Sequence, residues 1–377
     1  MFPDTCKTKT RRSFLHSTAL ATLGVISKRN ALAGAVQMPL PSLADAFKSK
    51  GILFGFAIND HRLSGDVAYR DLIAGQASII VPENAMKWQA LRPAADQFDY
   101  TRANTIVDFA QAHGIKIRGH ALCWHRAMPE WFEKIMTAEN AKALLVEHIQ
   151  TVVGHYAGKI HSWDVVNEVI RPDDKQPDGM RASFWYKLLG ESYIDAAFHA
   201  ARQADPKALL TYNDYGVEYD NGTDDAHRAA VLALLQRLKA RNVPIDAVGI
   251  QSHMRTARGE RFGDGVTDFI HAVRKMGLKV FITELDVDDS PQPASTAVRD
   301  DAVADVYSRY LQAVLDTEQV PVVLSWGVQD PASVQSEIKP RSDGAVTRPF
   351  LFDPQGQPTA AFYATLKAAR QALKTRG

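Results

Sequence analysis

Eight short and almost continuously hydrophobic segments recur along the chain, with longer stretches of helical character between them. Strands that are apolar at successive positions are buried on both faces, as in a parallel sheet, and parallel strands need helical crossovers. Eight such repeats predict a single α/β domain, a (β/α)8 TIM barrel. The segments are 52–58, 78–83, 116–124, 160–169, 209–215, 247–253, 279–286 and 322–327.

Helical patterns separate these segments, as over residues 224–240. There, Val231, Leu234 and Leu238 fall on one face of a helix with 3.6 residues per turn. A doubly wound open sheet is the alternative architecture, but no glycine-rich phosphate-binding turn follows the first hydrophobic segment. We expect further helices over 141–153, 184–203, 298–315 and 360–373.

The first 33 residues have the features of an export signal. The pair Arg11-Arg12 precedes a modest apolar run, and Ala31-Leu32-Ala33 forms a small-x-small cleavage site. A twin arginine is typical of the route that carries folded proteins, and the apolar run is too short to span a bilayer. We therefore expect residues 1–33 to be a twin-arginine-type signal, although a disordered tail is the alternative. Residues 34–377 would then form the exported domain, in the periplasm or outside the cell.

Charge argues against a nucleic-acid partner. Residues 1–33 carry six basic residues and one acidic residue, so their removal changes the net charge from +1 to about −4. A mildly acidic protein has no electrostatic reason to bind a phosphate backbone. No later stretch contains about 18 apolar residues in succession, so we expect no membrane contact after cleavage. Cys123 then has no disulfide partner, and we expect it to be a small buried apolar residue.

Polar and aromatic residues gather where the hydrophobic segments end. The carboxyl ends of barrel strands meet at one face, so these side chains should converge on one cleft. Carboxylates and amides bind sugar hydroxyls, and indoles stack on the apolar faces of pyranose rings. The residues are Glu83, Asn84, Lys87, Arg118, His120, Trp124, His125, Asn167, Glu168, Asn213, Tyr215, Gln251, His253, Glu284, Asp286 and Trp326.

Glu168 and Glu284 are the best pair of carboxyl groups for glycoside hydrolysis, which needs one protonated and one ionised carboxyl beside the scissile bond. Glu168 follows the apolar run WDVVN, and such surroundings favour its protonated form. Glu284 stays ionised if His253 and Asn213 donate hydrogen bonds to it. Asp286 could orient His253, as carboxylates often orient imidazoles.

Eight short motifs stand in a fixed order over about residues 45–375. They are FGFAI, ENAMKW, RGHALCWH, WDVVNE, YNDY, QSH, ITELD and SWG, followed by FLFD. In this order the chain closely resembles glycoside hydrolase family 10, the endo-β-1,4-xylanases. The resemblance implies a retaining enzyme whose catalytic domain acts on xylan or xylo-oligosaccharides, without a cofactor or a metal ion. Its two carboxyl groups should lie about 5–5.5 Å apart. We expect a monomer.

The resemblance also implies roles for individual residues. Glu168 should be the acid/base and Glu284 the nucleophile, while Asn167 should bind the 2-hydroxyl of the sugar at subsite −1. His253 should position Glu284, with Asp286 behind it. The substrate-binding residues implied are Glu83, Asn84, Lys87, His120, Trp124, Asn213, Tyr215, Gln251 and Trp326.

One position departs from the family pattern. The family usually carries a second tryptophan shortly after the SWG motif, in the pattern D-x-x-S-W. Here the sequence from Asp330 is DPASV, so Val334 stands where the indole is expected. Either the cleft is more open near subsite −1 or the loop folds differently, and we expect weaker binding of the substrate.

Two other functions stay open from the residues alone. A metal-dependent hydrolase could use His120, His125 and His253, but neither an H-x-H pair after an early strand nor an H-E-x-x-H helix occurs. A non-catalytic sugar-binding barrel would have no need of both glutamates. The choice between xylan and cellulose depends on whether the cleft excludes a C6 hydroxymethyl group, a discrimination worth about 1–3 kcal/mol.

Overall fold

The computed structural model describes residues 40–257, 260–330 and 340–375. The expected signal over 1–33 and Val334 both lie outside the described residues. The chain divides into two units, Met1–Pro41 and Ser42–Gly377, and the fold below is that of the second unit.

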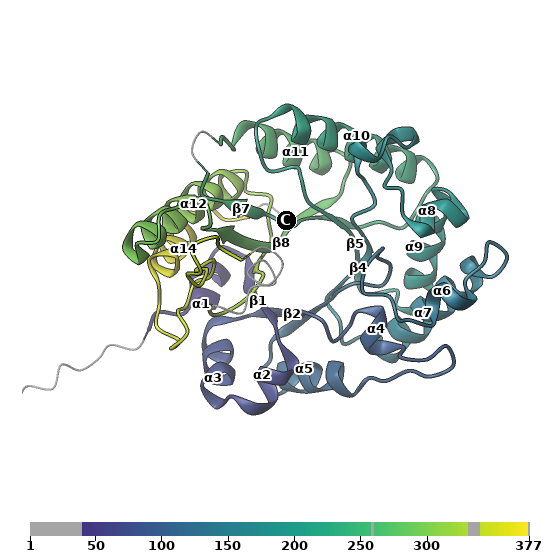
Figure 1. The fold of residues 1–377 in the computed structure, drawn as a ribbon, viewed down its shortest axis with the longest axis horizontal. Coiled ribbons are helices and arrows are strands. Elements are labelled where there is room, and N and C mark those ends of the chain that lie inside the picture. The colour runs from purple at the N-terminus through teal and green to yellow at the C-terminus, as the bar shows by residue number, and fades with distance from the viewer. Residues whose placement is uncertain (1–39, 258–259, 331–339, 376–377) are drawn as a thin grey trace, which may run out of the picture. The chain divides into compact units, whose positions relative to one another are not determined.

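Parallel strands close into a barrel in the described part of this unit (Figure 1). The pairing runs β6-β5-β4-β3-β2-β1-β9-β8, and β8 pairs again with β6, which completes the ring. The predicted (β/α)8 barrel is therefore confirmed. The strands are β1 (Leu53–Ile58), β2 (Ile79–Pro82), β3 (Lys116–Gly119), β4 (Ser162–Asn167), β5 (Leu209–Asp214), β6 (Ala247–Ile250), β7 (His253–Arg255), β8 (Lys279–Asp288) and β9 (Val322–Ser325).

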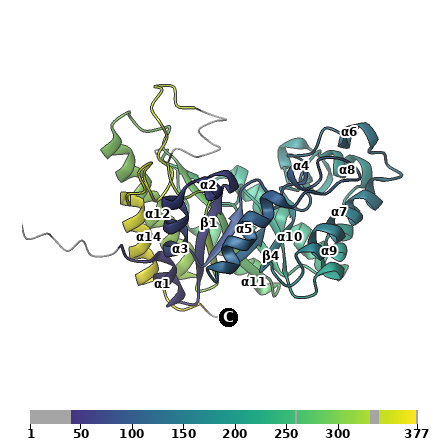
Figure 2. The same cartoon turned by 90° about the horizontal axis from the view of Figure 1, so that it is seen from below.

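Helices surround the strands on the outside (Figures 1 and 2). The described helices are α1 (Leu43–Lys48), α2 (Asp60–Gly65), α3 (Val67–Gln76), α4 (Trp88–Leu91), α5 (Thr101–Ala112), α6 (Phe132–Ile135), α7 (Ala141–His155), α8 (Phe184–Leu189), α9 (Ser192–Ala204), α10 (Gly222–Ala240), α11 (Asp264–Lys275), α12 (Thr296–Asp316) and α14 (Ala360–Gln371), with 3₁₀ turns η1 (Pro172–Asp174) and η2 (Pro177–Gly179). Among these described helices, none is long and apolar enough to cross a membrane.

Two predicted elements are broken where the backbone enters the left-handed region. The helix expected over 184–203 is α8 followed by α9, because Gly190 between them has φ 59°. The strand expected over 247–253 divides into β6 and β7 at Ser252, which has φ 64°. Ser252 is held there by a hydrogen bond from its backbone N–H to Glu218 (2.8 Å) and by a contact of its hydroxyl with Tyr310 (2.7 Å).

The barrel interior combines apolar packing with one buried ion pair. Ala57, Val81 and Phe281 belong to a cluster of fully buried apolar residues contributed by several strands. The guanidinium of Arg118 pairs with Asp164 and lies 5.4 Å from the ring centroid of Phe281. The sequence analysis placed Arg118 among the polar residues at the strand ends, and the structure shows that it pairs with an acid inside the barrel. The expected burial of Cys123, which is 1% exposed, is confirmed as well.

Gly119 at the end of β3 permits a close approach to β4. A Cβ atom on Gly119 would lie 2.1 Å from the ring of Trp163, which is completely buried. Any side chain here would push the two strands apart, because an indole packed on all sides cannot move away. Gly119 therefore fixes the spacing of the strands that lead to His120 and to Asn167.

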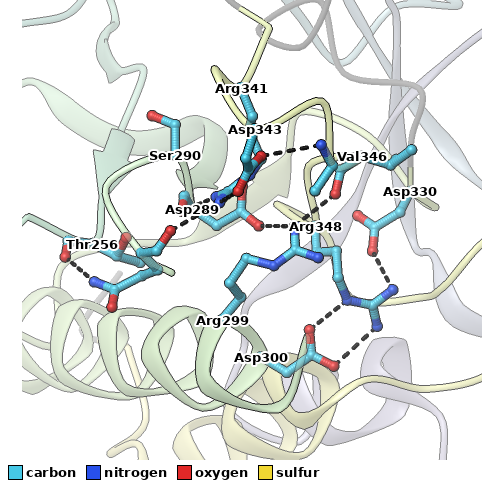
Figure 3. A network of polar contacts seen from close by, with 12 residues as sticks. Thr256, Asp289, Ser290, Arg299, Asp300, Asp330, Arg341, Asp343, Val346 and Arg348 are labelled. Atoms are coloured by element: carbon cyan, nitrogen blue, oxygen red, sulfur yellow. Dashed lines mark hydrogen bonds and ion pairs between the residues drawn. The ribbon is translucent and has the colours of Figure 1, made fainter. Parts of the chain in front are cut away.

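A buried network of charges ties the loop after β8 to residues 341–348 (Figure 3). Arg299, near the start of α12, donates to Asp289 at 3.0 Å and to the carbonyl of Val346 at 2.7 Å. Arg341 donates to the carbonyl of Asp289 at 2.6 Å. Asp289 is completely buried, so these arginines compensate a charge that has lost its water.

Removal of one partner from this network should destabilise the fold. Arg299→Met leaves Asp289 buried with weaker compensation, so we expect the free energy of unfolding to fall by about 3–5 kcal/mol. The matched control is Arg309→Met on the same helix, whose ion pair with Asp305 is more than half exposed on both sides. Its loss should cost less than about 1 kcal/mol. Urea unfolding measures both, and equal effects would contradict the assignment.

Candidate active site

The predicted site residues lie at or just beyond the carboxyl ends of successive strands. Asn167 is the last residue of β4 and Glu168 follows it, while Asn213 lies near the end of β5. Glu284 lies in β8, and Trp326 follows β9. All of these strands run parallel, so their ends bring the side chains to one face of the barrel.

Glu284 is a buried carboxylate surrounded by hydrogen-bond donors. Its Oε1 accepts from Asn213 Nδ2 at 2.7 Å, and its Oε2 lies 3.3 Å from His253 Nε2. Nδ1 of His120 lies 4.0 Å from Oε1. Burial alone would raise the pKa of Glu284, but the hydrogen bond from His253, the charge of His120 and the Asn213 amide outweigh it, so the pKa lies below its usual value. Glu284 is therefore ionised near neutrality.

Glu168 has the opposite electrostatics. Its Oε1 accepts from Gln251 Nε2 at 3.3 Å, and its side chain is 13% exposed. Burial raises the pKa of Glu168, and the nearby carboxylates of Asp214 and Glu284 raise it further against weaker hydrogen bonds. The sequence predicted this direction from the apolar WDVVN run, and burial is indeed the largest cause. Glu168 is thus the carboxyl group that holds a proton more tightly.

A chain of side-chain amides joins the two carboxyl groups. Asn213 Nδ2 donates to Glu284 Oε1 at 2.7 Å and lies 2.9 Å from the side-chain amide of Asn167. The orientation of Asn213 is fixed because an ionised carboxylate can only accept a hydrogen bond, and the Asn213 Oδ1 then contacts the Thr283 hydroxyl at 2.7 Å. Gln251 Nε2 lies within hydrogen-bond reach of both Asn167 and Glu168. The relative placement of Glu168 and Glu284 is therefore set by hydrogen bonds of three neutral residues.

His253 stands between two carboxylates. Its Nδ1 bonds to Oδ1 of Asp286 at 2.9 Å while its Nε2 faces Glu284. Burial lowers the pKa of His253, but the charges and hydrogen bonds of Asp286 and Glu284 outweigh this and raise it well above the ordinary value. The orienting contact predicted between Asp286 and His253 is present. A charged imidazole in this place keeps Glu284 ionised.

The far wall of the site is built from His120, Lys87 and two tryptophans. His120 Nδ1 bonds to Asp164 at 2.9 Å, and its ring meets that of Trp326 edge to face with centroids 5.1 Å apart. Lys87 Nζ lies 5.1 Å from the ring centroid of Trp124. Burial lowers the pKa of Lys87 against the opposing charges of three glutamates.

The remaining predicted residues extend the site on two sides. Asn84 accepts from Lys87 at 2.9 Å, and Glu83 accepts from Asn59 at 3.2 Å. Tyr215 lies beyond β5, where its hydroxyl accepts from Arg181 at 2.8 Å. The sequence analysis assigned His125 no role in the glycosidase reaction, and in the structure its Nε2 lies 3.9 Å from Oε2 of Glu168. Burial lowers the pKa of His125 to about 4, so it is neutral near pH 7.

Two residues beside Glu168 were missed by the sequence analysis. Asp214 is a carboxylate 2% exposed inside an apolar strand, and such a residue almost always has a partner, which was the available signal. It lies 3.7 Å from His227. Arg181 belongs to an irregular segment after η2, and no motif around it indicates a contact with Glu168.

Ring nitrogens of His120 and His253 are bonded to the carboxylates of Asp164 and Asp286. Among the residues that the structure describes, no group of three or more His, Cys, Asp or Glu side chains is arranged to hold a metal ion. What the site offers is one ionised carboxylate, one carboxyl group of raised pKa, and amides and indoles around them.

Residues 42–368 match the model of glycosyl hydrolase family 10. The chain belongs to this family. As a member of glycosyl hydrolase family 10, it is a glycoside hydrolase, and its barrel is the fold of its relatives of known structure.

Two characterised relatives are similar over most of the chain. Endo-1,4-beta-xylanase A of Caldicellulosiruptor sp. is 36% identical in an alignment of 355 positions, which covers 87% of this chain and 47% of that enzyme. This chain thus spans about half the length of that relative. Endo-1,4-beta-xylanase 2 of Claviceps purpurea is 32% identical over 93% of this chain and 98% of its own length.

Solved structures of the family agree with the fold. Native xylanase 10B from Thermotoga maritima has a TM-score of 0.80 at 32% identity, and the match covers 88% of this chain and 98% of that one. Xylanase 10B from Thermotoga petrophila RKU-1 in complex with xylobiose has the same TM-score at 31% identity, over 89% of this chain and 98% of that one.

The contact between Asp286 and His253 should control the charge of the imidazole. In Asp286→Asn the imidazole loses one of its two anions, so we expect the pKa of His253 to fall by at least about one unit. NMR titration of the histidine rings measures this. Asp288→Asn removes a charge from the same strand, two residues further on, and should leave His253 nearly unchanged. Equal shifts in both variants would show that general charge, and not the contact, is responsible.

Proposed function

We propose that this glycosyl hydrolase family 10 protein is a retaining endo-1,4-β-xylanase. It hydrolyses internal β-1,4-xylosidic bonds of xylan or xylo-oligosaccharides by double displacement through a covalent glycosyl-enzyme intermediate. The observation that carries the proposal is the pairing, at one end of the barrel, of a buried ionised Glu284 with a Glu168 whose pKa is raised. Retaining glycosidases need such a pair. The xylanase names of its relatives support the choice of substrate.

In the first step the two glutamates act together. Glu168 transfers its proton to the glycosidic oxygen while Glu284 attacks the anomeric carbon, so the C–O bond breaks and the shortened chain leaves with the proton. Positive charge develops on the sugar ring in the transition state, next to the carboxylate of Glu284. The donors His253 and Asn213 hold that carboxylate and keep it free of a proton.

In the second step Glu168 works in the reverse direction. Now ionised, it takes a proton from water, whose oxygen attacks the anomeric carbon and displaces Glu284. Both groups return to their starting states, and the product keeps the β configuration after two inversions. Asn213 donates to Glu284 and Gln251 donates to Glu168, so these amides and that of Asn167 beside them are placed to bind hydroxyls of the sugar between the glutamates.

The remaining predicted residues fit a neutral polysaccharide. Trp124 and Trp326 are partly buried, and they offer indole surfaces to pyranose rings. Glu83, Asn84 and Lys87 supply polar groups for the next sugar along the cleft. We also propose that residues 1–33 are a twin-arginine-type signal and that 34–377 is the exported catalytic domain, because Arg11-Arg12, the apolar run and Ala31-Leu32-Ala33 fit the pattern of such a signal. We propose that the mature protein is a monomer.

Digestion of a defined oligosaccharide tests the reaction and its stereochemistry together. We expect xylohexaose to be cleaved at internal bonds, and ¹H NMR to detect the β anomer first. Glu284→Gln should be inactive, because an amide cannot attack the anomeric carbon. Cellohexaose under the same conditions should be cleaved far more slowly. An α anomer as the first product would refute retention, and intact xylohexaose would refute the xylanase assignment.

Loss of Glu168 should depend on the leaving group. In Glu168→Ala we expect kcat/KM on xylan to fall by about 10²–10⁴-fold, and far less on an aryl β-xylobioside whose leaving group needs no proton. In the native enzyme kcat/KM should rise with pH through the lowered pKa of Glu284 and fall through the raised pKa of Glu168. The falling limb should vanish for the aryl substrate in the variant. Equal losses on both substrates would contradict the acid role.

A further inference from the structure

Arg181 is a buried cation beside Glu168 to which the mechanism above assigns no role. It is 4% exposed and follows a bridge between Ile170 and Met180 that folds the segment after β4 back on itself. Its Nε donates to the backbone carbonyl of Glu168 at 2.5 Å, and its Nη2 donates to the hydroxyl of Tyr215 at 2.8 Å. The same Nη2 lies 3.8 Å from Oε2 of Glu168. One guanidinium therefore contacts both the backbone and the carboxyl group of this glutamate.

The backbone of Glu168 needs such support. Its φ of 56° lies in the left-handed region, which residues other than glycine rarely adopt and which persists only where the surroundings hold it. The Glu168 N–H donates to the carbonyl of Asn213 at 2.9 Å. With Arg181 on its carbonyl, Glu168 is held on both sides, and the turn directs its side chain toward Gln251 and His125.

Neutral donors on Trp124 and Gln251 bond the carboxyl group of Glu168 and lower its pKa, and Arg181 is the cation that lies within 4 Å of it. Burial and the carboxylates of Asp214 and Glu284 all favour its protonated form. His125 is neutral near pH 7, as its lowered pKa indicates. The titratable or charged groups that face Glu168 are His125 from the segment after β3, Arg181 from the segment after η2, Asp214 from β5, Glu284 from β8 and, across the site, Lys87.

We propose that Arg181 is a positioning residue for the reaction, which fixes the turn at Glu168 and supplies the positive charge that allows this carboxyl group to alternate between acid and base. The inference rests on the proposed retaining function, since only a double displacement asks Glu168 to be protonated in one step and ionised in the next. Arg181 contacts no reacting atom and acts through Glu168.

The two variants that separate these effects are Arg181→Gln and Arg181→Lys. Glutamine removes the charge but keeps a hydrogen-bond donor, and lysine keeps the charge but loses the planar fork that reaches two partners. In Arg181→Gln we expect the falling limb of kcat/KM against pH to move up by about one unit, because a cation within about 4 Å favours the ionised form. In Arg181→Lys the limb should stay near its native place.

The two reaction steps should respond differently in Arg181→Gln. On an aryl β-xylobioside with a good leaving group, the second step limits turnover, and it needs Glu168 as a base. We therefore expect kcat to fall, by up to about tenfold at a pH below the pKa of Glu168, because there each unit by which the pKa rises lowers the ionised fraction tenfold, while kcat/KM changes little. A residue with a merely structural role would lower both quantities together and leave the pH limb in place.

Direct titration keeps this test independent of the proposed function. ¹³C-labelled glutamate, with Glu168→Gln for assignment, reports the pKa of the Glu168 carboxyl whatever reaction is catalysed. We expect it to rise in Arg181→Gln and to change little in the control Arg202→Gln. Arg202 lies in the last turn of α9, just before the start of β5, where it donates to the carbonyl of Ala208 at 2.9 Å and pairs with Asp246, so this control removes the same charge.

An unchanged Glu168 pKa in Arg181→Gln would overturn the proposal, even if activity were lost. If the glutamine variant did not fold, as judged by thermal unfolding, Arg181→Met would take its place as the uncharged variant. A shifted pKa together with an α anomer as first product would instead mean that the electrostatic contact exists and that the retaining function is wrong. The two failures are thereby distinguished.

Discussion

The active site depends on one amide, that of Asn213, which donates to the carboxylate of Glu284 and contacts the side-chain amide of Asn167. Because an ionised carboxylate only accepts hydrogen bonds, the bond to Glu284 fixes the orientation of the Asn213 amide. The Asn213 side chain thereby connects β5 with β4 and β8, the strands that position the two glutamates. Its hydrogen bond also stabilises the negative charge of Glu284 in a place from which water is largely excluded. His253 stabilises the same charge from the other side, and Asp286 in turn bonds to His253.

Two carboxyl groups of identical chemistry thus differ in proton affinity because their neighbours differ. Hydrogen-bond donors and a charged imidazole lower the pKa of Glu284. Burial and the charges of Asp214 and Glu284 raise the pKa of Glu168, whose hydrogen bonds are weaker. The barrel makes this difference in pKa possible, because different strands bring the neighbours of each glutamate to the same face. The site is therefore assembled from residues at the ends of several strands, and no single strand carries both glutamates and their hydrogen-bond partners.

The sequence predicted the barrel and the gathering of polar residues because parallel strands and their carboxyl ends leave a regular pattern of hydrophobicity. Patterns of that kind carry no information on backbone turns. The left-handed residues Ser252 and Gly190 divided elements that periodicity joined, and Arg181 reached Glu168 from an irregular segment 13 residues later. Asp214 was missed for a different reason, because strand alternation places its side chain on the face opposite that of Asn213. Contacts made by loops depend on tertiary folding and produce no periodic pattern of hydrophobicity in the sequence.

The buried charges of Asp289, Arg299 and Arg341 have a consequence for protein engineering. They join two segments that are about 50 positions apart in the sequence, and each segment satisfies polar groups that the other one buries. A loop transplanted from a relative into either segment would leave Asp289 or its arginines buried without their charged partners, even if the backbone of the loop fitted well. Segments 289–300 and 341–348 therefore form a single exchangeable module, and chimeras that respect this boundary should retain the barrel's cooperativity.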